Sequence, residues 1–449
     1  MSQTPRPGMV TADRVIRGYF LISGLYTLAA ALIWGVNTLF LLDAGLDIFG
    51  VFVANGAYTA GMVIFEIPTG VLADTRGRRV SFLLSVVILS MTTVAYVAAA
   101  RMGGGLGSFV IVSVFMGLGF TFYSGAVEAW LVDALKAADY GGQLDHVFAR
   151  GAMVTGSAML VGTVTGGLLG SIDLAVPYLV RAGMLVAVFG VAFVVMHDLG
   201  FTARALRWSD IPREMRAVAR ESMTYGWNRR PVRLLMLCSA VQMGFLTWGF
   251  YAWQPYLLEL LGRDVVWVAG IVAALIAAST IAGNALTYWL TRFCGHRSTL
   301  LLWSAGVQTV AAVGVGLVGS FWAAVALLLV VTGAMGVAGP VKQAFLHQMV
   351  PSAQRASVLS FHSLVASAGG VGAQGSLGYL ARVRSIADGY VVGGLFTLLA
   401  IPVLVLLRRR HEDADRIVGD RAGQRAACAA QGLPEVTQVD TTTHRAVGT

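Results

Sequence analysis

The sequence predicts an all-α integral membrane protein of twelve transmembrane helices, arranged as two pseudo-symmetric six-helix bundles. The first observation is composition: of 449 residues, 57% are hydrophobic and only 12% are charged. A soluble domain carries about 25% charged residues. The second is a series of apolar runs of membrane-spanning length, and the third is a basic loop that recurs in both halves of the chain. Because one globular core could not hide so much apolar surface, the apolar solvent is expected to be lipid.

The apolar runs predict the helix count. A membrane-spanning helix needs roughly 20 mostly apolar residues. Six such runs precede a polar, arginine-rich stretch between His197 and Arg233, and six follow it. They cover residues 18–41, 49–72, 80–100, 108–132, 149–170, 175–196, 232–258, 265–290, 299–318, 321–346, 356–380 and 387–407. The first run has the length of a full span and lacks a signal-peptide cleavage site, so we expect it to be retained.

These runs divide the chain into five segments. They are an N-terminal segment (1–17), an N-terminal six-helix bundle (18–196), a linker (197–231), a C-terminal six-helix bundle (232–407) and a tail (408–449). In the linker, Ser209 to Pro212 is typical of a helix start. It predicts an amphipathic helix on the membrane surface, with a solvated linker as the alternative. The tail lacks hydrophobic periodicity and is expected to be mostly disordered.

Arginines are unevenly distributed between the loops, and this accounts for the net charge of +9 without a nucleic-acid partner. With twelve spans, most of them lie on the side that holds both termini and the linker. The opposite loops are short and carry Asp43, Asp47, Asp173 and Asp264, with Arg101, Arg263, Arg382 and Arg384 as exceptions. The positive-inside rule therefore predicts a multi-pass protein of the cell (plasma) membrane with both termini in the cytoplasm.

Motifs for several other functions are absent. The three cysteines are far apart and no Cys-x-x-Cys occurs, so no zinc or redox site is indicated. The sequence also lacks a Gly-x-x-x-x-Gly-Lys-Ser/Thr loop, a His-Glu-x-x-His pair and a Gly-x-Ser-x-Gly elbow. We therefore expect no enzyme activity, no ATPase within this chain, and no metal or other cofactor.

A basic loop recurs at an offset of 218 residues, which aligns Gly77 with Gly295. The first copy, residues 70–81, reads Gly-Val-Leu-Ala-Asp-Thr-Arg-Gly-Arg-Arg-Val-Ser. The degenerate second copy, residues 290–299, reads Leu-Thr-Arg-Phe-Cys-Gly-His-Arg-Ser-Thr. Each copy follows the second helix of a six-helix half. Related halves with a substrate site between them are typical of transporters that rock between two states.

At these residues the chain resembles the major facilitator superfamily. The signature of that family, Gly-x-x-x-Asp-x-x-Gly-Arg-Arg/Lys, is complete as Gly70, Asp74, Gly77, Arg78 and Arg79. The segments 66–70 (Glu-Ile-Pro-Thr-Gly), 124–130 (Ser-Gly-Ala-Val-Glu-Ala-Trp) and 355–360 (Arg-Ala-Ser-Val-Leu-Ser) are similar to a bacterial subgroup that resembles drug and metabolite exporters. The resemblance implies that the signature loop locks the two halves on the cytoplasmic side in the outward-open state. The alternative is a loop that only sets topology.

The chemistry of the loop fits a lock. Gly70 would permit close approach of the second helix to a neighbour, and Gly77 would permit a tight turn. Asp74 can pair with an arginine or cap a helix.

The sequence departs from the exporter pattern in two places. No arginine occurs between Ser108 and Val132, in the fourth run. The fifth-helix pattern Gly-Pro-x-x-Gly-Gly appears as residues 162–167 with Thr163 in place of proline. These departures weaken the inference of an antiporter.

Charged residues near the ends of runs are candidates for gating. Glu128 in the fourth run and Lys342 in the tenth lie at similar depths in equivalent helices. We expect them to approach across the inner mouth in the outward-open state and to separate when it opens. The alternative pairs Glu128 or Asp133 with arginines of the signature loop.

Polar and aromatic residues within the runs are candidates for the substrate cavity. They are Asn37, Tyr58, Tyr123, Trp248, Tyr251, Gln254 and Gln308, together with Asn55, Gln242, Trp253, Asn284 and Gln374. Trp248, Tyr251 and Gln254 recur every three residues and lie roughly along one helix face. Such a stripe suits an amphiphilic ligand, but interfacial belts and ordinary packing give the same pattern. Arg181 is expected to snorkel to the headgroups, and His362 is more typical of packing than of titration.

Together these features predict a secondary active transporter that works by alternating access. Its partners would be the lipid bilayer and a small-molecule substrate, and a monomer would suffice. Proton-coupled efflux of a small amphiphilic drug or metabolite, driven by the proton gradient, is the first hypothesis. Uptake of a nutrient or metabolite by a symporter or facilitator is the alternative. A membrane enzyme or a channel is less consistent with the repeat.

Overall fold

The computed structural model describes residues 11–142, 144–201, 213, 216, 220, 222–262, 265–350, 355–409 and 415–417. Its regular elements in this part of the chain are helices, apart from an isolated antiparallel bridge between His296 and Arg416. The amphipathic helix expected in the linker and most of the tail lie outside the described residues. The all-α prediction is confirmed.

The N-terminal half contains eight helical segments that make up six passes. They are α1 (Ala12–Ala31), α2 (Asn37–Asp43), α3 (Ile48–Arg76), α4 (Arg78–Arg101), α5 (Leu106–Tyr123), α6 (Ala126–Ala137), α7 (Leu144–Gly170) and α8 (Val176–Val195). Two passes are interrupted: α1 continues into α2 through residues 32–36, and α5 continues into α6 through Ser124 and Gly125. Gly125 has a φ of +73°, a conformation that favours glycine.

The C-terminal half repeats this arrangement. The described elements are η2 (Ser222–Trp227), α10 (Arg230–Leu261), α11 (Val266–Phe293), α12 (Arg297–Leu317), α13 (Phe321–Met349), α14 (Arg355–Val383), α15 (Ile386–Thr397) and α16 (Ala400–Arg408). The last pass is also interrupted, between α15 and α16. Twelve passes result when the interrupted pairs are counted once.

Ten segments among the described residues are long and apolar enough to cross a membrane by length and composition. The other two predicted passes are α1–α2, which is interrupted, and α14, which is rich in glycine, alanine and serine. α14 packs against α10 in its own half and against α3 in the other half. A helix enclosed on two sides needs less apolar surface than one that faces lipid, which explains its lower hydropathy.

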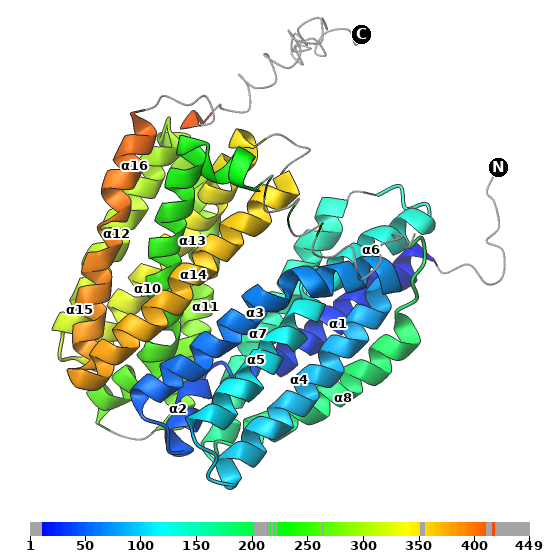
Figure 1. Ribbon diagram of the computed structural model, residues 1–449, viewed down its shortest axis with the longest axis horizontal. Coiled ribbons are helices and arrows are strands. Elements are labelled where there is room, and N and C mark those ends of the chain that lie inside the picture. The colour runs from blue at the N-terminus through cyan, green and yellow to red at the C-terminus, as the bar shows by residue number, and fades with distance from the viewer. Residues whose placement is uncertain are drawn as a thin grey trace, which may run out of the picture.

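The passes alternate between two faces of the molecule. We call the end that holds the start of α1, the α3–α4 turn and the end of α16 the termini face. The opposite end, with loops 44–47, 102–105, 171–175, 318–320 and 384–385, is the far face. In Figure 1 the two bundles meet near α2 on the far face and diverge toward the termini face, where α6 and α16 lie apart.

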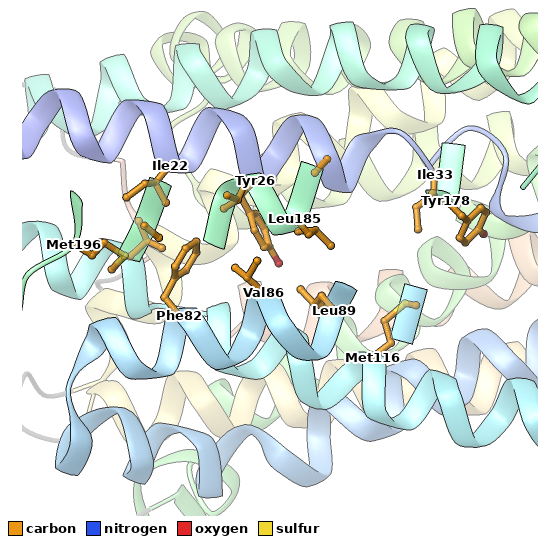
Figure 2. Packing of buried hydrophobic residues seen from close by; sticks show 14 of the residues in the cluster. Ile22, Tyr26, Ile33, Phe82, Val86, Leu89, Met116, Tyr178, Leu185 and Met196 are labelled. Carbon is orange, nitrogen blue, oxygen red and sulfur yellow. The ribbon is translucent and has the colours of Figure 1, made fainter. Parts of the chain in front are cut away.

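Each half has its own buried core. The first core draws all its members from the N-terminal half, and Figure 2 shows Val86 and Leu89 of α4 pointing toward Tyr26 of α1 and Leu185 of α8. Two further cores lie in the C-terminal half, one of which includes Phe52 from α3. Separate cores allow the halves to move as units, because rocking then disturbs only the contact between them.

Candidate functional site

The far face is closed by hydrogen bonds between the two halves. The Gln254 side chain of α10 is fully buried. Its Oε1 accepts from the Thr38 amide at 3.1 Å, and its Nε2 donates to the Trp34 carbonyl at 2.7 Å. The break between α1 and α2 leaves these two backbone groups without helical partners. Gln254 therefore satisfies, from the other half, groups that the interrupted helix leaves open.

Glycines bring helices of the two halves into close contact on the same face. A Cβ added to Gly167 of α7 would lie 2.8 Å from the Cα of Gly270 in α11. A Cβ on Gly378 of α14 would lie 2.8 Å from the Cβ of Phe52 in α3. The altered pattern at residues 162–167 thus serves close packing, partly against α1 and partly across the halves.

An ion pair joins the halves at the edge of the far face. Arg382 Nε lies 2.9 Å from Asp47 Oδ2, and the side chains are 55% and 49% exposed. Asp47 also accepts a hydrogen bond from the Gly50 amide at 2.7 Å and so caps α3. Arg382 is one of the exceptions to the arginine distribution, and its partner gives a physical reason for its position.

The predicted substrate stripe is a contact between the halves in this conformation. Trp248 is fully buried and stacks on Phe52, with ring centroids 5.7 Å apart. The Tyr251 carbonyl accepts from Thr38 Oγ1 at 2.8 Å, and Gln254 binds the α1–α2 break. The expectation that Trp248 and Gln254 line a cavity therefore fails for this state. Helical spacing identifies a shared face but not what packs against it.

Other cavity candidates are divided between buried and half-buried positions. Gln308 of α12 is 2% exposed inside the C-terminal half, and its Nε2 has no partner among the described residues, so it lines no cavity here. Asn37 Oδ1 accepts from Tyr178 at 2.8 Å, while its Nδ2 donates to Asn55 at 3.0 Å. This network orders α2 against α3 and α8.

Three predicted tyrosines, Tyr58, Tyr123 and Tyr251, are only half-buried. Tyr123 stacks on Tyr26 with ring centroids 3.8 Å apart. Tyr58 meets Phe120 edge-on at 6.2 Å. Their partial exposure leaves them free to meet a ligand between the halves.

The signature loop on the termini face binds only its own half. Gly77 has a φ of +99°, and Asp198, which follows α8, lies against it and accepts from the Arg79 amide at 2.9 Å. Arg78 Nη2 lies 2.7 Å from Asp74 Oδ1. Arg79 Nη2 donates to the Phe193 carbonyl at 2.7 Å. The cluster is assembled, but among the described residues it does not engage the C-terminal half.

The remaining gating candidates are apart in this state. A Cβ on Gly70 would meet nothing within 4 Å, so the close helix approach expected there is absent while the face is open. Glu128 is exposed in the first turn of α6 and Asp133 is half-buried. Neither forms an ion pair in the described part of the chain, so neither predicted pairing of Glu128 is present. Lys342 instead donates to Gln242 at 2.8 Å.

The C-terminal half holds an equivalent of the Asp198 contact that the sequence patterns did not indicate. Asp415, after α16, is 2% exposed and accepts from the Ser298 amide and hydroxyl, each at 2.7 Å. The offset of 218 carries Asp198 to within one residue of Asp415. The prediction of a disordered tail is therefore wrong for residues 415–417. An acid shortly after the last helix of each half was the available signal.

Arg181 of α8 also differs from its prediction. It is 6% exposed, so it does not snorkel to the headgroups. Its Nη1 lies 4.0 Å from Met116 Sδ, and its Nε has no hydrogen-bond partner among the described residues. Four tyrosines of the N-terminal half, Tyr26, Tyr58, Tyr96 and Tyr178, lie within electrostatic range of the guanidinium. The apolar run located the helix but not the side that α8 turns inward.

Two six-helix halves that close one face and open the other define the class of membrane transporters that work by alternating access. A family model described as Major Facilitator Superfamily matches residues 19–301, well over half of the chain. The chain therefore belongs to the major facilitator superfamily, as its signature loop implied. A comparison with curated proteins gives no significant match.

Solved transporters share this fold at low sequence identity. The nucleoside transporter NupG is 10% identical with a TM-score of 0.72, and the match covers 88% of this chain and 99% of that one. A bacterial homologue of the human lysosomal transporter Spinster, in an inward-facing and occupied conformation, is 15% identical with a TM-score of 0.65, covering 93% and 100%. The human organic anion transporter MFSD10 is 15% identical with a TM-score of 0.60, covering 89% and 100%. These likenesses concern the fold alone.

Proposed function

We propose that this transporter exports a small amphiphilic compound across the cell membrane in exchange for protons. The observation that carries the proposal is the difference between the faces. Gln254, Gly167 and Gly270 seal the far face across the halves, whereas the signature loop on the termini face engages one half only. A chain closed at one end and open at the other is in one of the two states that alternating access requires.

The orientation rests on the arginines. Arg78, Arg79 and Arg230 all lie on the termini face, and the positive-inside rule assigns that face to the cytoplasm. The conformation is then inward-open, and the termini are cytoplasmic. A compound from the cytoplasm would enter between the halves from this side.

Glu128 is the group that we propose for proton release. It is exposed on the open face, beside the break between α5 and α6, and has no ion-pair partner among the described residues. Tyr19 and Tyr123 lie within electrostatic range of it. A carboxylate that faces the cytoplasm here and approaches Lys342 in the opposite state would change its proton affinity with the state. Exchange of the two charges, Glu128→Lys with Lys342→Glu, should restore transport lost in either single variant.

Proteoliposomes provide the main test. Purified protein is reconstituted, and substrate-dependent proton flux is measured with and without an imposed pH gradient. Export coupled to protons requires that the gradient drive substrate accumulation and that substrate movement carry protons the other way. Flux that is indifferent to the gradient would remove the coupling, and the transporter would then be a facilitator.

Uptake is the second candidate, and one observation favours it. Thr163 replaces the proline of the exporter pattern, and its hydroxyl donates to the carbonyls of Met159 and Leu160 at 3.0 and 3.1 Å. The threonine thus lies within a continuous α7, without the helix disruption that proline causes. In the same proteoliposomes, protons and substrate moving in one direction would identify a symporter.

A further inference from the structure

A cavity of about 490 Å³ lies in the C-terminal half between α10, α13 and α14. Its polar lining consists mainly of Ser239, Gln242, Lys342 and His362, and we call it the Lys342 cavity. Lys342 lies two turns from the end of α13 at Met349, and His362 lies two turns from the start of α14. The cavity therefore belongs to the half of the bundle nearest the open termini face.

The Lys342 cavity presents donors without an acid. Lys342 Nζ donates to Gln242 Oε1 at 2.8 Å, and His362 Nε2 lies 2.9 Å from Ser239 Oγ. Gln242 and Ser239 are each 4% exposed, so both are held in place by packing. No aspartate or glutamate is among the residues that line the cavity, and Lys342 forms no ion pair in the described part of the chain.

Lys342 keeps unused hydrogen-bonding capacity. An ammonium group has three N–H donors, and one amide oxygen occupies a single one of them. A charged group at depth in a membrane protein is costly unless it is paired, and such residues mark substrate and ion paths. The positive end of the cavity therefore lacks the partner that an anion would provide.

The opposite half adds to the same electrostatic pattern. Arg181 is buried and likewise forms no ion pair among the described residues. The carboxylates nearest the open face, Glu66 and Glu128, are both exposed. The field between the halves is therefore positive at depth.

We propose that the Lys342 cavity binds the anionic group of a small organic anion that has an apolar body. Lys342 would hold the anion with charge-assisted hydrogen bonds. Met243, Leu246 and Leu359 in the same cavity would pack against the apolar part. The inference rests on the proposed function, because it takes the cavity as part of the transport path.

The composition of the chain supplies a direct probe. The sequence contains only two lysines, Lys136 and Lys342. Lys136 is exposed in the last turn of α6 and serves as an internal control. Reductive methylation with ¹³C-formaldehyde would give one NMR signal for each lysine and one for the N-terminal amine. The variants Lys136→Arg and Lys342→Arg assign the signals by their loss.

The labelled protein, in nanodiscs of phosphatidylcholine, is titrated with 2-naphthoate and separately with the neutral isostere 2-naphthamide. We expect 2-naphthoate to shift the Lys342 signal saturably, with no shift at Lys136 and none from the amide. Equal effects of acid and amide, equal shifts at both lysines, or no shift at Lys342 would each overturn the proposal. A further arm adds phosphatidylglycerol to the nanodiscs. A shift at Lys342 from this lipid alone, with none from naphthoate, would assign the cavity to an anionic lipid and overturn the proposal of a soluble anion.

A binding measurement on unlabelled protein separates charge from shape. By calorimetry, Lys342→Met should weaken 2-naphthoate binding roughly tenfold or more, because it removes a charged hydrogen-bond donor. Lys342→Arg should keep most of the affinity, since it keeps the charge. Unchanged affinity in Lys342→Met would contradict the proposal. Both measurements are made at equilibrium, so anion binding without proteoliposome transport would count against the proposed function alone, and transport without anion binding against the inference alone.

Discussion

The far face and the termini face use different chemistry for opening and closing. On the far face the two halves are joined by glycine contacts and by hydrogen bonds from Gln254, most of them buried. On the termini face the signature loop satisfies its charges within one half, through Asp74 and Asp198. Buried packing contacts are lost sharply when helices separate, whereas charges can exchange partners in water. The far face should therefore determine how stable this conformation is, and the termini face should determine what replaces it.

Replacement of Gly167 by alanine should break the comparison most strongly. The new Cβ would lie 2.8 Å from the backbone of Gly270, and only the far-closed state contains this contact. Overpacking costs about 1–3 kcal/mol, which would shift the population roughly five- to hundredfold toward far-open states. Spin labels on loops 171–175 and 384–385 would report the change as a longer distance.

Gly156→Ala is the matched control for that prediction. It lies in the same helix, α7, and a Cβ there meets nothing within 4 Å. An equal shift in both variants would show that α7 itself, and not its contact with Gly270, sets the equilibrium.

Gln254→Leu should have the next largest effect. It leaves the Thr38 amide and the Trp34 carbonyl without partners in the closed face, at a cost of about 1–3 kcal/mol. Opening of the far face would hydrate both groups, so the closed state alone is penalised. Gln308→Leu is the control, because that buried amide does not join the halves. No difference between the two variants in the same distance measurement would contradict the assignment.

On the termini face, Gly77→Ala should lower thermal stability. Its φ of +99° is strained for any residue with a Cβ, and the side chain would also meet Asp198. A left-handed conformation costs roughly 1–2 kcal/mol. Gly70→Ala should leave the melting temperature unchanged or slightly raised, since it is helical with open space around it. If the signature loop closes this face, Gly70→Ala should nevertheless slow transport in proteoliposomes.

Removal of the ion pair at the edge should have the smallest effect. Arg382→Gln breaks a contact whose two side chains are about half exposed. Exposed pairs contribute about 0–1 kcal/mol and are screened by salt. We expect a small shift toward the far-open state at low ionic strength that vanishes at high salt. A large or salt-independent shift would mean that Asp47 acts through its cap on α3 instead.

The sequence could predict the fold because lipid imposes a simple rule. Apolar runs of fixed length and arginines in alternate loops are readable along the chain, and both follow from the solvent on each side of the membrane. The signature at Gly70–Arg79 added the family, which the family model confirms. The repeat near Gly295 has a structural counterpart in the caps by Asp198 and Asp415.

The site was harder to predict because one helix face serves different partners in different states. The spacing of Trp248, Tyr251 and Gln254 correctly suggested a common face but could not reveal Phe52 and the α1–α2 break packed against it. Arg181 was placed in the right helix with the wrong surroundings, since hydropathy does not resolve rotation about a helix axis.

The sequence by itself determined the number of passes, their two-fold repetition and the side that carries the positive charge, because these depend on local composition and on the surrounding solvent. Only the tertiary structure decided which face is closed, and that the interrupted first pass offers its backbone to Gln254. It also decided that Lys342 lies in a cavity without an acid. These features depend on contacts between residues 100 or more positions apart. Such contacts form when whole helices pack, and no pattern within one helix encodes them.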